Sequence, residues 1–206
     1  MPWLIATAAD SYRVATEDRV AAWPTAYGLL VAVADGMGGR AGGAAAANFV
    51  IRHLEAHARW PAFPTPDALA ELLRQIDRDA AAQSGGGETT AIVCALTESE
   101  VSGAAVGDSA AWWVTATAVQ ALTVEAVRKP WVGSGSANPL PFAVPNVPGT
   151  LLLMTDGVWE YADPAVLRDI ARGDDLATIP ARLIDAARMR TGQLQDDAAL
   201  VVARRN

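Results

Sequence analysis

Residues 31–50 read VAVADGMGGRAGGAAAANFV, and this stretch constrains the fold more than any other. A short apolar run, typical of a buried strand, ends at Asp35. A glycine-rich segment follows at once, and then a run of alanines that indicates a helix. An acid between a buried strand and a nearly bare backbone could belong to a phosphate-binding loop, a metal site or a tight turn from strand to helix.

The composition predicts one globular domain over residues 1–206. Hydrophobic residues make up 51% of the chain and charged residues 19%, which is typical of a folded protein rather than a disordered one. The formal net charge is −7, and an acidic surface repels phosphate backbones. We therefore expect no nucleic-acid partner, and any anionic substrate must be attracted by a local arginine or a bound cation.

The single cysteine and the chain start bear on where the protein works. Cys94 lies in the apolar run TTAIVCAL, so we expect a buried core residue, and one cysteine cannot form a disulfide within the chain. The first residues, MPWLIATAADSYRVATEDR, lack the features of a signal peptide, and no apolar run reaches the length of a membrane span. We expect a soluble, cytoplasmic, monomeric protein with no membrane partner.

The apolar runs predict an α+β fold. Strands are expected at 3–8, 27–34, 89–96, 100–107, 110–117, 150–155 and 198–205, and helices at 43–60, 65–83, 164–171 and 175–190. Residues 130–149, rich in proline and glycine, are expected to form an exposed loop. The three strands between 89 and 117 follow one another too closely for crossover helices, so they suit antiparallel neighbours. This order favours antiparallel sheet covered by helix layers over a doubly wound parallel sheet.

Isolated acids stand next to several of these strands. They are Asp35, Asp108, Asp156, Asp196 and Asp197. Acids in such places are costly unless they are paired or bind a metal, and few basic residues lie nearby in the sequence. Carboxylates that converge would repel one another, and a divalent cation would hold them together. Carboxylate and water oxygens favour Mg²⁺ or Mn²⁺.

A zinc site on a helix is a weaker interpretation of the sequence. His53 and His57, with Glu55 between them, lie one helical turn apart and could bind zinc, but no third ligand is in view. The alternative is that these residues simply lie on a solvent-exposed face of the helix.

The glycine-rich segment also has competing explanations. A phosphate-binding loop would need a lysine that DGMGGRAGG lacks. Gly36, Gly38 and Gly42 could form a dinucleotide fingerprint, but Asp35 would then stand beside the pyrophosphate, and the acid about 20 residues on, Glu55, lies in a helix. A plain turn explains the glycines but not Asp35.

Five segments, taken together, resemble a known family. VAVADGMGG, GGGETTAIV, AAVGDSAAWWV, LLLMTDGVWE and LQDDAALVV occur in this order, after YRVATEDR. This set resembles the PP2C (PPM) family of metal-dependent serine/threonine protein phosphatases, in a compact bacterial form, from about residue 10 to the C-terminus. The resemblance implies a four-layer α-β-β-α sandwich of two antiparallel sheets flanked by helices, with a two-metal centre at one end.

The resemblance also implies roles for the acids. Asp35 would bridge two Mn²⁺ or Mg²⁺ ions, the carbonyl of Gly36 would bind one of them, and the need for that carbonyl would explain the bare backbone. Asp156 and Asp196 would complete the first metal. Asp108 would belong to an optional third metal site shared with Asp156.

The same resemblance implies how the reaction runs. Arg13 would bind the substrate phosphate, and Glu17 and Asp18 would hold metal-bound water. Arg13, Asp35 and Asp156 would thus be the catalytic residues, and a metal-activated water would attack phosphorus without a covalent intermediate. The implied partners are a phosphoprotein substrate and a cognate serine/threonine kinase.

Some positions depart from the family pattern. Ala110 follows GDS where many relatives have arginine, Glu88 stands where a small residue is common, and Met37 occupies a slot that is histidine in some relatives. The region that would carry a helical flap beside the active site is cut down to residues 124–149. Two alternatives to an active protein phosphatase therefore stay open: an inactive or weakly active regulatory module with the same fold, and a small-molecule phosphatase.

Overall fold

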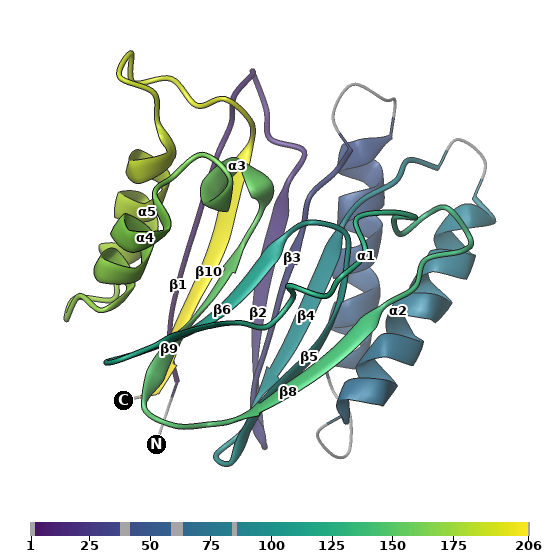
Figure 1. Ribbon diagram of the computed structural model, residues 1–206. Helices are drawn as coiled ribbons and strands as arrows, with labels where there is room; N and C mark the ends of the chain where they lie inside the picture. Colours follow the sequence, from purple (N-terminus) through teal and green to yellow (C-terminus); the bar gives the residue numbers. More distant parts are fainter. Residues whose placement is uncertain (1–2, 38–41, 59–63, 84–85, 206) are drawn as a thin grey trace.

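A computed structural model of the chain describes residues 3–37, 42–58, 64–83 and 86–205. It consists of two five-stranded antiparallel sheets packed face to face, with helices on both outer sides (Figure 1). The first sheet has the order β1 (Trp3–Asp10), β10 (Ala198–Arg205), β9 (Gly149–Met154), β6 (Ala110–Thr115) and β7 (Val119–Ala121). The second has the order β2 (Arg19–Thr25), β3 (Gly28–Ala34), β4 (Ala91–Leu96), β5 (Glu100–Val106) and β8 (Leu140–Pro145). The expected α-β-β-α sandwich is confirmed.

The helices form the two outer layers. The second sheet is covered by α1 (Gly43–His57) and α2 (Pro66–Ala81). The first sheet is covered by α3 (Asp156–Trp159), α4 (Pro164–Ala171) and α5 (Ile179–Ala187). None of the helices in the described part of the chain combines the length and the apolar character needed to cross a membrane.

Strand β3 shows why the central strands read as continuous apolar runs. Leu29, Val31 and Val33 point into the core between the two sheets. Leu30 and Ala32 point the other way, into the core beneath α1 and α2. Because successive side chains of a strand alternate between its faces, a strand between two cores must be apolar on both.

Two local expectations are confirmed in detail. Thr65 caps α2, since its side chain accepts a hydrogen bond from the backbone N–H of Ala68, and Pro66 occupies the first turn. Cys94 is fully buried between the sheets, and burial raises the pKa of its thiol.

The expectation that residues 130–149 form only a loop is wrong. The segment contains β8, which pairs with β5 at the edge of the second sheet. Pro141 and Pro145 hid this strand from sequence analysis, because proline cannot donate to a central ladder. An edge strand needs only one side of its backbone for pairing, so it tolerates both residues.

The expectation that the three strands between 89 and 117 are antiparallel neighbours is only half right. Strands β4 and β5 do pair, but β6 pairs with β9 and β7 in the other sheet. The short GDS connection around Asp108 therefore carries the chain from one sheet to the other.

Other boundaries also differ from expectation. Strands β2 and β7 and the short helix α3 were not predicted, and α5 is shorter than the range 175–190. Helix α4 has the predicted range 164–171. The predicted end of the first helix near residue 60, Gly38 of the glycine-rich segment, and Ser84 and Gly85 lie outside the described residues.

Candidate metal centre

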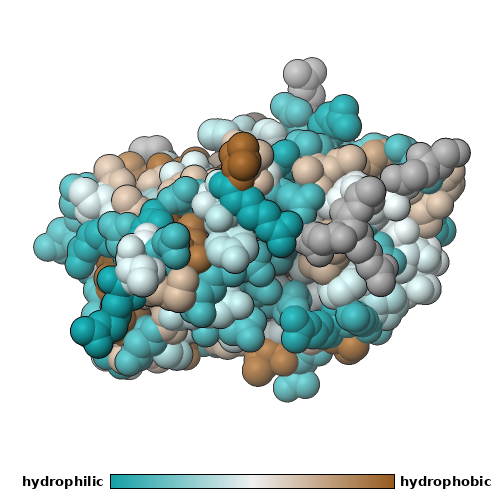
Figure 2. Space-filling model, turned by 90° about the horizontal axis from the view of Figure 1, so that it is seen from above, coloured by the Kyte–Doolittle hydropathy of each residue, from teal (hydrophilic) through white to brown (hydrophobic). Residues whose placement is uncertain are grey.

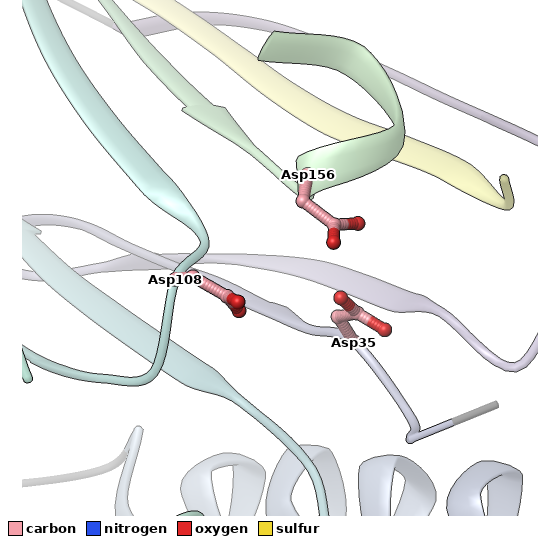
Figure 3. A group of neighbouring side chains, drawn as sticks. All are labelled: Asp35, Asp108 and Asp156. Atoms are coloured by element: carbon pink, nitrogen blue, oxygen red, sulfur yellow. The ribbon is translucent and has the colours of Figure 1, made fainter. Parts of the chain in front are cut away.

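Three of the predicted acids meet at one end of the sandwich. Asp35 follows β3, Asp108 lies in the connection from β5 to β6, and Asp156 begins α3. One carboxylate oxygen from each lies within 4.8 Å of the others, and the side chains point toward a common space (Figure 3). The strands that carry them come from both sheets, so the packing of the sheets creates the cluster.

Two threonines fix the backbone of Asp35. Its N–H donates to the Thr90 hydroxyl at 3.0 Å, and its carbonyl accepts from the Thr90 N–H at 2.9 Å. The Thr89 hydroxyl donates to the same carbonyl at 2.7 Å. Sequence analysis found both threonines in the segment GGGETTAIV but assigned them no role.

The turn that carries Asp108 is held from two sides. Gly107 has φ +94°, a conformation that favours glycine, and the hydroxyls of Ser109 and Thr90 lie 2.8 Å apart. The indole N–H of Trp159 in α3 donates to the Asp108 carbonyl at 2.9 Å. Asp108 is thereby tied to the threonine that holds Asp35 and to the helix that begins with Asp156.

Asp156 is placed by the approach of α3 to the start of β10. The Thr155 hydroxyl accepts a hydrogen bond from the Ala199 N–H at 2.9 Å. A Cβ at Gly157 would collide with the carbonyl of Asp197, so this close approach requires glycine. The glycine of the TDG motif thus brings Asp156 beside the pair Asp196 and Asp197.

The remaining predicted acids line the same cleft with different roles. Asp18 is buried, and one of its carboxylate oxygens has no hydrogen-bond partner among the described residues. Asp196 is exposed and lies outside the group of three acids within 4.8 Å. Asp197 accepts hydrogen bonds from the backbone N–H groups of Tyr12 and Glu17, at 2.9 and 2.7 Å, and so fastens the segment that carries Arg13.

Arg13 lies where substrate could reach it. Its exposed side chain lines the cleft, and its guanidinium carbon lies 5.8 Å from the centre of the Tyr12 ring. Glu17 and Asp18 line the same cleft. The structure thus brings together all the residues that the sequence predicted for the site.

The cleft has a volume of about 710 Å³ and is strongly acidic. Among the described residues, its lining contains seven acids and two arginines, Arg13 and Arg128. Figure 2 views the molecule from this end, and hydrophilic residues spread across the middle of that face. An anionic substrate could approach this cleft only if bound cations neutralised part of the negative charge of the cleft.

Burial and mutual repulsion raise the pKa values of the clustered acids. For Asp35, burial acts first and the charges of Asp18 and Asp156 add to it, so its pKa lies far above the ordinary range. Burial likewise raises the pKa of Asp18 to about 7 and that of Asp156 to about 6. Carboxylates so arranged favour protons or metal ions over a shared negative charge.

Unpartnered oxygens also fit a cation. One carboxylate oxygen of Asp18 and one of Asp108 are buried without a hydrogen-bond donor among the described residues. A buried carboxylate oxygen without a partner is unfavourable in a finished structure. An oxygen-only ligand set of this kind suits Mg²⁺ or Mn²⁺.

Close backbone packing leaves no room for a side chain at Gly36. A Cβ there would lie 2.5 Å from the carbonyl carbon of Gly43 and 2.9 Å from the carbonyl oxygen of Glu17. Close backbone packing therefore requires glycine at this position, whether or not its carbonyl binds a metal.

Sequence analysis missed Arg128. Its guanidinium Nε lies 2.6 Å from a carboxylate oxygen of Asp108, and the arginine side chain is 68% exposed while that of the acid is 16% exposed. Arg128 belongs to the region taken as a shortened flap. That region therefore still contributes the side chains of Arg128 and Trp131 to the lining of the cleft.

The segment that carries Arg128 is anchored to the rest of the site. Val132 forms a bridge with Thr89, which in turn bridges Gly36. Asp77 of α2 is buried and accepts backbone N–H groups from Gly133, Gly135 and Ala137, at 2.8, 3.0 and 2.9 Å. The sequence offered one indication of this contact, namely an acid on the buried side of an amphipathic helix, and that acid lies far in the sequence from residues 133–137.

The alternative sites do not gain support. The Nδ1 atoms of His53 and His57 lie 2.9 and 2.8 Å from backbone carbonyls of their own helix, and the one metal-compatible group of side chains among the described residues includes neither. Asp35 faces other acids, so a pyrophosphate beside it would be repelled.

The two-sheet sandwich with acids gathered at one end is the fold of PP2C-type phosphatases. A family model described as Stage II sporulation protein E (SpoIIE) matches residues 25–206. The chain belongs to this family. A search of curated proteins found no significant match.

Solved structures with the same fold include several bacterial phosphatases. A "bacterial serine phosphatase" has a TM-score of 0.83 and 18% identity, with 97% of this chain and 96% of that chain covered. The catalytic domain of the serine threonine protein phosphatase PstP, in complex with two manganese ions, has a TM-score of 0.82 and 21% identity over 98% and 97%. Stp1 from Staphylococcus aureus has a TM-score of 0.81 and 18% identity over 99% and 94%. At these identities the matches show the fold.

Proposed function

We propose that this protein hydrolyses phosphoserine and phosphothreonine in proteins, with a water molecule activated at a binuclear Mg²⁺ or Mn²⁺ centre. The observation that carries the proposal is the convergence of Asp35, Asp108 and Asp156 within 4.8 Å, in a cleft where buried carboxylate oxygens lack partners. The proposal covers residues 1–206 as one domain that acts as a monomer in the cytoplasm.

The ligands of two cations would come from four residues: Asp35, the carbonyl of Gly36, Asp156 and Asp196. Asp108, with Asp156, would hold a third. When bound, the cations supply the charge that lowers the pKa of a water molecule and neutralises phosphoryl oxygens. The two manganese ions of the PstP structure support this assignment.

The other residues of the cleft would bind and orient the reactants. The planar guanidinium of Arg13 can donate two parallel hydrogen bonds to phosphoryl oxygens. Glu17 and Asp18 would orient water by accepting its hydrogen bonds. Cys94 is buried between the sheets, and no cysteine or histidine is among the described residues that line the cleft, which supports attack by water without a covalent intermediate.

The substrate would be a phosphoprotein made by a cognate serine/threonine kinase. A further structural neighbour, PppA, is described as a key regulatory component of the type VI secretion system (T6SS) of Pseudomonas aeruginosa. This description supports a regulatory role for proteins of this fold.

The decisive experiment measures phosphate release from phosphoserine and phosphothreonine peptides with Mn²⁺, with Mg²⁺ and with EDTA. We expect release with either metal and none in EDTA. An inactive regulatory module would bind Mn²⁺ in calorimetry without releasing phosphate. A small-molecule phosphatase would hydrolyse an aryl phosphate and leave the peptides intact.

A further inference from the structure

A second hollow lies at the opposite ends of the strands that carry the acids. It is lined by the end of β6, the start of β9 and the end of β10, together with Arg172 after α4. Asp108 precedes β6, Asp156 follows β9 and Asp196 precedes β10, so the acidic cleft lies at the other ends of the same strands. The five residue steps from Ala110 to Thr115 separate the two ends by about 17 Å.

This hollow, the arginine pocket, is basic in an otherwise acidic protein. Arg172, Arg204 and Arg205 line it, and none of the described residues of its lining is an acid. The two acids that pair with these arginines, Asp169 and Glu98, lie outside the lining, and their side chains are 63% and 80% exposed. The pocket therefore presents a concentrated positive charge on a chain of net charge −7.

Protein contacts hold these arginines in place and leave some of their donors available. Arg172 donates from Nε to the Thr115 carbonyl at 2.9 Å. Arg204 donates from Nε to the Thr150 hydroxyl and from one terminal nitrogen to the carbonyls of Ala171 and Gly173. The second terminal nitrogen of Arg204, Nη1, donates to no described residue, and the same holds for Nη2 of Arg172. These guanidinium groups are thus fixed by one edge and have unused donors on another.

The rest of the lining is largely apolar. Val147 and Pro148 contribute to it, and Val147 is exposed, whereas the side chain of Val114 is buried in the core. The cavity volume of about 630 Å³ lies within the range of roughly 300–1,000 Å³ that is usual for small-molecule sites. Apolar walls with a few fixed polar groups are the usual composition of such a site.

We propose that the arginine pocket binds a small organic anion, in which an apolar body carries one carboxylate, sulfonate or phosphate group. The anionic group contacts the unused terminal nitrogens of Arg172 and Arg204, and the body lies on Val147 and Pro148. The inference goes beyond the phosphatase reaction and does not depend on it, because no residue of the pocket belongs to the acidic cleft.

Calorimetry with naphthalene-2-sulfonate, in EDTA at low salt, tests the proposal. Without metal the acidic cleft repels anions, so we expect one bound probe per chain. Sulfate lacks the apolar body and 2-naphthol lacks the charge, so each should bind at least about tenfold more weakly. Arg172→Gln should weaken sulfonate binding about tenfold, a loss typical of a charge-assisted hydrogen bond. Arg205→Gln should weaken it less, because both terminal nitrogens of Arg205 already bond to Glu98. Arg204 is left intact because its contacts support α4.

Matched variants separate this pocket from other sites. Arg74→Gln on α2 removes the same charge from a distant surface and should leave binding unchanged, as should Arg128→Gln in the cleft. Added NaCl should weaken the sulfonate more than the naphthol, since it screens charge. The proposal is overturned if the sulfonate shows no binding at millimolar concentration, if Arg128→Gln abolishes it, or if the folded double variant of Arg172 and Arg205 binds as well as the natural chain.

Discussion

The acidic cleft and the arginine pocket lie at opposite ends of β6, β9 and β10 and differ in how their charges are satisfied. In the pocket, Arg172 and Arg204 donate to carbonyl and hydroxyl oxygens of the protein itself. In the cleft, carboxylate oxygens of Asp18 and Asp108 are buried without a donor in the part of the chain that the structure describes. The arginines are compatible with a stable fold in the absence of a ligand, whereas the acids require protons or cations from outside.

The two regions therefore differ in how much a ligand can stabilise them. Arginines that the protein already holds by hydrogen bonds gain less from a bound anion than a repelling cluster gains from a cation that ends the repulsion. The acidic cleft should therefore respond strongly to metal and pH, and the arginine pocket weakly.

The largest effect is expected from Asp35→Asn. The substitution removes a charge at the centre of the cluster, so Mn²⁺ binding should be lost and phosphate release should fall by at least about a thousandfold, roughly 4 kcal/mol. Calorimetry with Mn²⁺ and phosphate-release kinetics measure the two quantities. Asp79→Asn on the exposed face of α2 is the matched control. Undiminished turnover in a folded Asp35→Asn protein would remove the basis of the metal site.

Asp77→Ala should lower stability substantially, although Asp77 lines neither the acidic cleft nor the arginine pocket. It removes the acceptor of three backbone N–H groups, which we expect to cost about 3 kcal/mol of the free energy of unfolding. The segment that carries Arg128 should loosen, while the arginine pocket should be unaffected. Urea unfolding measures the loss, and Asp79→Ala, two residues further along α2 on its exposed side, should change stability little. Equal stability of the two variants would mean that solvent replaces the carboxylate.

Arg13→Ala should reduce kcat/KM about ten- to a hundredfold, since a charge-assisted hydrogen bond contributes roughly 1.5–3 kcal/mol. Most of the loss should appear in KM if the contact is equally strong in the ground and transition states. Arg13→Lys should recover only part of it, and Mn²⁺ affinity should hardly change. Steady-state kinetics on a phosphopeptide decide the matter, and natural kinetics in Arg13→Ala would leave this residue without a role in binding.

The metal-free protein should become less stable as pH rises. The pKa values of Asp18 and Asp156 are raised to about 7 and 6 in the folded state, from 3.8. The protonated acids are thus favoured by folding, and this stability is present below pH 4 and is lost as pH rises through about 7. In EDTA the melting temperature should fall across that window. Mn²⁺ should raise it more at pH 7.5 than at pH 5, and an equal rise at both values would contradict the repulsion.

The smallest effect is expected from Arg128→Ala. Its ion pair with Asp108 is exposed on the arginine side, and such pairs contribute about 0.2–1 kcal/mol. Without this cation, Mn²⁺ should bind about two- to fivefold more tightly in calorimetry. Arg74→Ala provides the control. Weaker metal binding in Arg128→Ala would mean that the arginine positions Asp108 rather than competing for it.

The layered arrangement of sheet and helices, and the position of the acids at strand ends, could be predicted from the sequence alone. Alternation could not show which face of β3 is inner, but its unbroken apolar run placed the strand between two cores. The acids at strand ends, with the motifs around Asp35, Asp108 and Asp156, were enough to predict a metal centre. Those features are local, because a run of consecutive residues is enough to predict that a strand is buried and where it ends.

How these residues come together could be seen only in the tertiary structure. The GDS turn passes between sheets instead of joining neighbours, and this crossing puts Asp108 beside Asp35 and Asp156. The arginine pocket and the contact of Asp77 with residues 133–137 join segments that are far apart in the chain. Such contacts depend on how two sheets and their helices pack in space, and no pattern within one segment records the position of another.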